Sequence, residues 1–206
     1  MPKYKLNIKI TENDLQILYR ANEKIVIVKH TAENTDTQVA WVTFGPFMNN
    51  TVEWESQFAL YASNTEIQSG AFINKLSDIA ASTQTLYQFK EGIFQNPISV
   101  STISSNTFAL KHVMTGYPVL TFGLAQNVVV NGEGFANHPI NAINVPFGQA
   151  ATMTPVEILD VYLKNDINSS TVVSHIMSEK LTVSYTEELE RTIAYDGATG
   201  AFYLVS

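Results

Sequence analysis

Short runs of alternating apolar and polar residues recur along the whole chain, and this alternation constrains the fold more than any other feature of the sequence. An alternation with a period of two places the apolar side chains on one face of a β-strand. Turns rich in Gly, Pro and Asn separate the runs. The expected strands span residues 4–10, 24–29, 39–44, 51–61, 71–73, 85–89, 98–103, 107–113, 117–122, 126–130, 156–163, 171–177, 181–185, 192–195 and 201–205.

Only residues 12–22 show near-helical spacing of their apolar side chains. Thr11 and Asp14 stand at their start in a pattern of the capping-box type. Because no series of helices alternates with the strands, the sequence does not indicate the strand–helix–strand units of a parallel sheet. It predicts an all-β fold, mainly an antiparallel β-sandwich, with one short N-terminal helix.

The length and the polar composition favour one β-rich domain. A chain of 206 residues is within the usual size of a single domain. Ser, Thr and Asn together account for 52 residues, and these types favour strands and turns over long helices. We expect residues 1–206 to form one domain. A weak similarity between residues 40–80 and 144–182 would fit two similar halves.

Charge is unevenly distributed along the chain, whose formal net charge is -7. Residues 1–29 carry a net positive charge, and the remainder is acidic. The lysines at positions 3, 5 and 9 alternate along the first expected strand, so they form a solvated face and not a clustered basic stripe. Nucleic-acid binding depends on such a stripe, and we expect no nucleic-acid partner.

The segment from Gly92 to Val156 contains only two formal charges, Lys111 and Glu133. Four explanations are open: central strands of the fold, an uncharged ligand cavity, an oligomer interface, or a segment that enters a membrane. Sheet edges carry charge more than centres do, and interface cores are depleted in charge. Central strands are the first expectation and an interface between copies of the chain is the second.

Several kinds of site are excluded or disfavoured by residue type and spacing. The chain has no cysteine, which excludes disulfides, thiolate metal sites and a catalytic thiol. His30, His112, His138 and His175 lack the spacing of a metal pair, and we expect His112 and His138 to be buried and neutral. We therefore expect no metal and no cofactor. No signal peptide or transmembrane helix is expected, which predicts a soluble protein of unknown location.

Catalysis has weak support in the sequence. No G-x-S-x-G elbow is present, and whether the protein is an enzyme stays uncertain, with the balance against it. The best carboxylate pair is Glu53 and Glu55, which share one face of an expected strand, at a spacing near that used in glycoside hydrolysis. Trp41 and Trp54 are expected in the core.

The sequence favours a non-catalytic, lectin-like protein that acts by binding a neutral polar ligand such as a glycan, by binding a protein, or by self-association as a homo-oligomer. The candidate ligand-binding residues are Phe47, Tyr61, Tyr117 and His138. A first alternative is a membrane-active, toxin-like protein that inserts a Ser- and Thr-rich hairpin over residues 168–185. A second alternative is a glycan-acting enzyme that uses Glu53 or Glu55.

Overall fold

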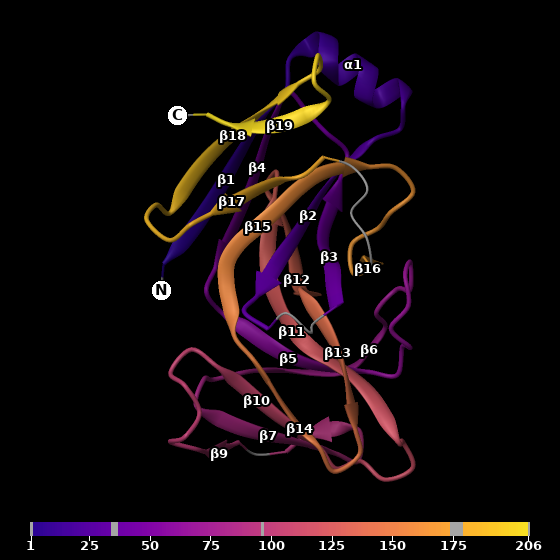
Figure 1. Ribbon diagram of the computed structural model, residues 1–206, viewed down its shortest axis with the longest axis vertical. Coiled ribbons are helices and arrows are strands. Elements are labelled where there is room, and N and C mark those ends of the chain that lie inside the picture. The colour runs from indigo at the N-terminus through magenta and orange to yellow at the C-terminus, as the bar shows by residue number, and fades with distance from the viewer. Residues whose placement is uncertain (1, 34–36, 96, 174–178, 206) are drawn as a thin grey trace.

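The computed structural model describes residues 2–33, 37–95, 97–173 and 179–205. Within them the chain forms one helix and many short strands, which confirms the all-β fold with a single short helix (Figure 1). The elements are β1 (Lys3–Lys9), α1 (Glu12–Arg20), β2 (Lys24–Thr31), β3 (Thr37–Phe44), β4 (Asn49–Glu55), β5 (Phe58–Ser63), β6 (Lys75–Ala80), β7 (Thr85–Lys90), β8 (Ile93–Phe94), β9 (Ile98–Ser99), β10 (Phe108–His112), β11 (Val119–Val130), β12 (Glu133–Pro139), β13 (Asn141–Pro146), β14 (Ala150–Met153), β15 (Pro155–Lys164), β16 (Val172–Val173), β17 (Leu181–Ser184), β18 (Glu190–Asp196) and β19 (Ala201–Leu204).

Most strands belong to one large, curved sheet. Its order is β17-β15-β2-β3-β13-β11-β4-β1-β18-β19, and β5, β6, β12 and β16 pair with members of this series. Neighbouring strands in the series run antiparallel except β1 and β18, which run parallel. The two ends of the series, β17 and β19, lie near each other, so the sheet curls round on itself (Figure 1).

A smaller sheet, of order β14-β10-β7-β8 with β9 beside β7, lies at the opposite end of the molecule from α1 (Figure 1). It packs on the larger sheet through aromatic rings. The rings of Phe89 and Phe122 lie 5.5 Å apart, as do those of Phe58 and Phe108. One hydrophobic core therefore contains side chains from both sheets.

Strand β11 is the centre of the larger sheet. One of its edges pairs with β4 and β5, and the other pairs with β12 and β13. The sequence predicted two strands here, over 117–122 and 126–130, but Gly123 does not interrupt the strand. A Cβ at Gly123 would overlap the Asn141 carbonyl oxygen and the Tyr61 ring, so glycine is needed for close packing at this point.

Locally encoded features agree with the sequence predictions. Thr11 caps α1 and accepts a hydrogen bond from the Asp14 backbone nitrogen at 3.3 Å. Asn131-Gly132 joins β11 to β12 as a hairpin, and Asp196-Gly197 lies in the turn that joins β18 to β19. The structure confirms these elements. They could be predicted because the residues that determine each of them lie close together in the sequence.

Other predicted strands are shorter or divided. The run 51–61 is interrupted at Ser56 and Gln57, and on the edges away from their shared partner β11, β4 pairs with β1 whereas β5 pairs with β6. The run 71–73 contributes only an isolated bridge between Phe72 and Thr171, and 98–103 is a strand only over Ile98–Ser99. The residue pattern of a run does not indicate where its partner strand ends, so the sequence overestimates the length of each of these strands.

The membrane hairpin that the sequence offered as an alternative over 168–185 is described only in part. Strand β16 pairs with β3, whereas β17 pairs with β15. Residues 174–178, which include His175, lie outside the described residues. Among the described residues, no helix has the length and apolar character needed to span a bilayer.

Candidate functional site

A groove opens on the outer face of the larger sheet where β11 changes partners. β4 pairs with β11 only at Val129 and Val130, whereas β5 pairs with residues 121–126 of β11. Between these contacts, the edge of β11 faces the connection at Ser56 and Gln57. The opening that results, here called the outer groove, has a volume of about 400 Å³, which is within the range of ligand-binding clefts in proteins.

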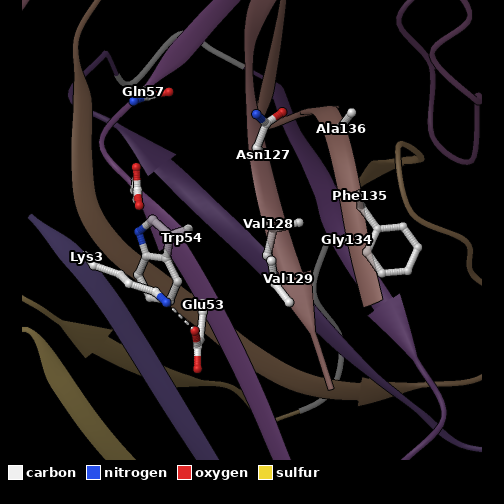
Figure 2. Close-up of a pocket in the computed structure, with 11 residues that line it drawn as sticks. Lys3, Glu53, Trp54, Gln57, Asn127, Val128, Val129, Gly134, Phe135 and Ala136 are labelled. Carbon is white, nitrogen blue, oxygen red and sulfur yellow. Dashed lines mark ion pairs between the residues drawn. The ribbon is translucent and has the colours of Figure 1, made fainter. Parts of the chain in front are cut away.

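The outer groove has one charged side and one mainly apolar side (Figure 2). Glu53 and Lys3 stand on the side of β1 and β4. Val129 lies on the opposite side and keeps 39% of its surface exposed. Gly134 and Ala136 of β12 continue that side, and the space above Gly134 is open, because no atom lies within 4 Å of where its Cβ would be. Small residues therefore keep this side low and accessible.

The carboxylate of Glu53 is held in place by lysines. Lys3 Nζ lies 2.7 Å from Glu53 Oε2, and Lys5 Nζ lies 4.0 Å from Oε1. The hydrogen bond from Lys3 lowers the pKa of Glu53, so this side chain is an anionic hydrogen-bond acceptor at neutral pH. As predicted, Glu53 faces outward while Trp54 faces the core.

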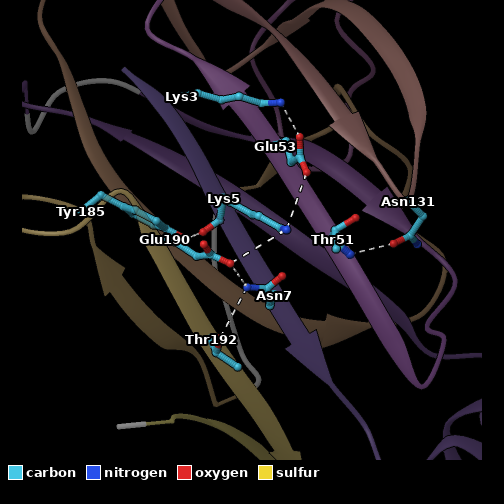
Figure 3. Close-up of polar contacts among 9 residues, drawn as sticks. All are labelled: Lys3, Lys5, Asn7, Thr51, Glu53, Asn131, Tyr185, Glu190 and Thr192. Carbon is cyan, nitrogen blue, oxygen red and sulfur yellow. Dashed lines mark hydrogen bonds and ion pairs between the residues drawn. The ribbon is translucent and has the colours of Figure 1, made fainter. Parts of the chain in front are cut away.

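Polar contacts extend from this carboxylate across the neighbouring strands (Figure 3). Lys5 Nζ also lies 3.9 Å from Glu190 Oε1, and that oxygen accepts a 2.7 Å hydrogen bond from Asn7 Nδ2. On the other side of β4, the backbone nitrogen of Thr51 donates to Asn131 Oδ1 at 2.8 Å. The exposed face beside the outer groove is thus a row of bonded polar groups.

A fixed carboxamide completes the polar lining. Asn127 lies at an irregularity in the pairing of β11 with β12, between Gln126 and Val128. Its Oδ1 accepts a 2.8 Å hydrogen bond from the Asn137 backbone nitrogen. This bond orients the amide and leaves its Nδ2 to donate to a ligand. Gln57 offers a second, exposed carboxamide at the strand break.

Directly behind the outer groove lies a buried lysine. The Lys29 side chain has no exposed surface, and its Nζ lies 5.3 to 5.4 Å from the ring centres of Trp41, Trp54 and Phe58. Cations are attracted to aromatic ring faces at such distances. We call this arrangement, with Gln126 and Glu157, the lysine cage.

Two polar side chains accept hydrogen bonds from the buried ammonium, and one of them, Glu157, also carries the opposite charge. Lys29 Nζ donates to Glu157 Oε2 at 2.7 Å and to Gln126 Oε1 at 2.8 Å. Burial lowers the pKa of Lys29 to about 8 and outweighs the opposing effect of Glu157. The sequence places Lys29 only at the end of the expected strand 24–29 and does not indicate the cage, because Gln126 and Glu157 lie 97 and 128 residues further along the chain.

The lysine cage fixes the wall of the outer groove. Trp54 Nε1 donates to Glu157 Oε2 at 2.9 Å, and Ser56 Oγ donates to Oε1 at 3.1 Å. The buried amide of Gln126 donates from Nε2 to the Glu55 carbonyl at 2.6 Å. These bonds reach residues 54, 55 and 56, so the strand break that opens the groove is held from inside.

A second buried charge lies on another part of the larger sheet. Asp160 has no exposed side-chain surface, and its carboxylate contacts Lys180 Nζ (2.6 Å), Thr182 Oγ1 (2.6 Å) and His30 Nε2 (2.9 Å). Burial by itself would raise the pKa of Asp160, but the hydrogen bonds lower it to about 2. This cluster lines no part of the outer groove and joins β2, β15 and β17.

The structure does not bring the four predicted ligand-binding residues together. Tyr61 is completely buried, and its hydroxyl donates to the Asn141 carbonyl at 2.6 Å. His138 is partly buried, its Nδ1 donates to the Trp41 carbonyl at 3.0 Å, and burial lowers its pKa. Phe47 is exposed beside a separate hollow near α1, and Tyr117 is exposed at the start of β11.

Among the described residues, no group of three or more His, Asp or Glu side chains is arranged to hold a metal ion. The polar groups that line the outer groove are the carboxylates of Glu53 and Glu55, the ammonium of Lys3 and the carboxamides of Gln57 and Asn127, and they lie beside an apolar surface. Comparisons of the chain with protein-family models, with curated proteins and with solved structures gave no match.

Proposed function

We propose that this protein binds neutral saccharides in the outer groove and does so without catalysis. A pyranose ring has hydroxyl groups around its rim and apolar C–H groups on its faces. The groove offers the matching features: an oriented carboxylate at Glu53 and an oriented amide at Asn127, next to the exposed aliphatic side chain of Val129. This combination is the observation that carries the proposal.

The state of Glu53 favours binding over glycoside hydrolysis. Hydrolysis needs a carboxylic acid with a raised pKa that protonates the leaving oxygen. The pKa of Glu53 is lowered by its hydrogen bond from Lys3, so its carboxylate is suited to accept hydrogen bonds from sugar hydroxyls. Lys3 and Lys5 would keep it in that state while a ligand is bound.

The test is a glycan array with the purified protein, followed by calorimetric titration of the saccharides that bind. Glu53→Gln and Asn127→Ala should each weaken affinity about tenfold, the effect of losing one good hydrogen bond. Glu187→Gln is the matched control, because Glu187 is an exposed carboxylate outside the groove. We expect this control to bind as the wild type does.

A blocking variant makes the test sharper. Gly134→Leu places a side chain in open space and should fill the groove without disturbing the packing. It should lose binding while its thermal unfolding stays that of the wild type. A blank array, or full binding by Glu53→Gln, Asn127→Ala and Gly134→Leu, would overturn the proposal.

A further inference from the structure

The two loops at the far end of β11 form a rigid, uncharged tip. Residues 113–118 precede β11 and residues 147–149 follow β13, and neither loop contains Asp, Glu, Lys or Arg. The tip exposes 39% of Tyr117 and 51% of Phe147. In Figure 1, this tip lies at the end of the molecule that is opposite α1.

A buried histidine fastens both loops. His112 is fully buried, its Nε2 donates to the Tyr117 carbonyl at 2.9 Å, and its Nδ1 accepts from the Met114 backbone nitrogen at 3.3 Å. One donating and one accepting nitrogen require the neutral ring. The His112 carbonyl accepts from Gly148 at 2.7 Å, and its ring lies against that of Phe147. Loops held in this way are organised before any ligand arrives.

Tyr117 stands between two hollows of different character. On one side, it lines an apolar hollow of about 550 Å³ with Pro118, Pro146 and Phe147. On the other side, it lines a hollow of about 600 Å³ that contains the exposed polar side chains of Asn64, Glu66 and Asn144. We call the two hollows together the Tyr117 groove.

The polar half of the Tyr117 groove is held by hydrogen bonds. The Thr121 hydroxyl donates to the Thr65 carbonyl at 2.6 Å and lies 3.1 Å from Asn144 Oδ1. The Asn144 carboxamide thus lies against this hydroxyl, and the bond from Thr121 to Thr65 fixes the loop that carries Asn64 and Glu66 to β11. An aromatic platform next to exposed amides is a surface to which a sugar ring fits, with its apolar face on the ring and its hydroxyls on the amides.

We propose that the Tyr117 groove is a second saccharide-binding site, which makes one chain bivalent; this inference rests on the proposed function of the outer groove. The two sites lie at opposite ends of the same strand, from Val119 to Val129. At the rise of a β-strand, ten residues separate them by about 30 Å. A rigid spacing of this size allows one molecule to bridge two chains of a surface glycan and to gain avidity.

Calorimetry with neutral methyl glycosides of mannose, galactose and N-acetylglucosamine separates the two sites. We expect the wild type to bind two equivalents of at least one of them. Gly134→Leu and Tyr117→Ala should each bind one, and the double variant none. Asn144→Ala should weaken the second site about tenfold. Tyr203→Ala, which removes an exposed tyrosine elsewhere, should bind two, and thermal unfolding checks that each variant is folded.

The outcomes distinguish the two proposals. If Gly134→Leu abolishes all binding, the second site is refuted and the outer groove stands. If Tyr117→Ala abolishes all binding and Gly134→Leu has no effect, the outer groove is refuted and the Tyr117 site stands. Sugar-free phosphatidylcholine vesicles form the last arm: capture of wild type but not of Tyr117→Ala, with no glycoside bound at that site, would overturn the saccharide assignment in favour of a lipid interface.

Discussion

A lysine–glutamate ion pair lies on each side of β4, one exposed to solvent and the other buried. On the outer face, Lys3 and Glu53 meet at 2.7 Å with 62% and 27% of their side chains exposed. On the inner face, behind Trp54, Lys29 and Glu157 also meet at 2.7 Å, but with 0% and 18% exposed. Distance alone therefore says little about the role of such a pair. Burial makes the inner pair a structural element, and exposure leaves the outer carboxylate available to a ligand.

The largest difference between the two pairs should follow from removing the inner cation. Lys29→Met keeps the volume of the side chain but leaves Glu157 without its ammonium, and we expect a loss of about 3 kcal/mol in the free energy of unfolding. Urea denaturation measures it. The double variant Lys29→Met/Glu157→Gln should recover part of this loss. A single variant as stable as the wild type would mean that the cage is not structural.

Removing the inner anion should have a smaller effect, of about 2 kcal/mol, since Lys29 keeps its hydrogen bond to Gln126 and its aromatic neighbours. In Glu157→Gln, the indole of Trp54 loses a charged acceptor, so tryptophan emission should change together with stability. Glu55→Gln, on the exposed end of β4, is the control. Unchanged emission and stability in Glu157→Gln would contradict the contacts of the inner face.

The inner pair should also make the free energy of unfolding depend on pH, by about 1 kcal/mol per pH unit in the range where Lys29 titrates. The pKa of Lys29 is about 8 when folded, against 10.5 for an ordinary lysine. Between these values the unfolded chain binds more protons, so unfolding takes up a proton and stability rises with pH. The rise should end near pH 10, because burial raises the pKa of Tyr162 and of Tyr185, which disfavours the folded state once tyrosines ionise in the unfolded chain.

Urea denaturation of wild type and Lys29→Met from pH 7 to pH 10 isolates this contribution, since other groups cancel in the difference. The variant should lack the rise. A wild-type curve that runs parallel to that of Lys29→Met would show that Lys29 titrates at the same pH in both states.

The outer pair should give the smallest change in stability. Exposed ion pairs contribute little, and we expect the free energy of unfolding of Lys3→Met and of Glu53→Gln to stay close to that of the wild type. Their effect should be on saccharide affinity instead. A loss of stability as large as that of Lys29→Met would remove the contrast between the faces of β4.

What the sequence predicts well is what it encodes locally. The capped helix at Thr11, the hairpin at Asn131-Gly132 and the opposite facing of Glu53 and Trp54 follow from neighbouring residues, and the structure shows each of them. The low charge between Gly92 and Val156 coincides with the central strand β11, although the same segment also supplies the exposed tip at Tyr117.

The candidate site was less predictable, because its parts meet only through the register of distant strands. The strand break at Ser56 is held by hydrogen bonds to Glu157 and Gln126, and no pattern in the neighbouring sequence indicates this break. Tyr61 is a candidate ligand-binding residue of the sequence, a role that requires an accessible side chain. It is buried because β5 continues along β11 and places the Tyr61 ring over Gly123. Asn127 reaches the groove through an irregular pairing that alternation does not indicate.

The position of β1 has a consequence for how the chain acquires its structure. β1 lies between β4 and β18, and its parallel partner is residues Glu190–Ala194. During synthesis, one edge of this strand therefore stays unpaired until residues 190–194 have been made. Pairings across such long stretches of chain are slow to form. We expect folding to be slow, with the edge of β1 as the place where an unfinished chain is open to misassociation.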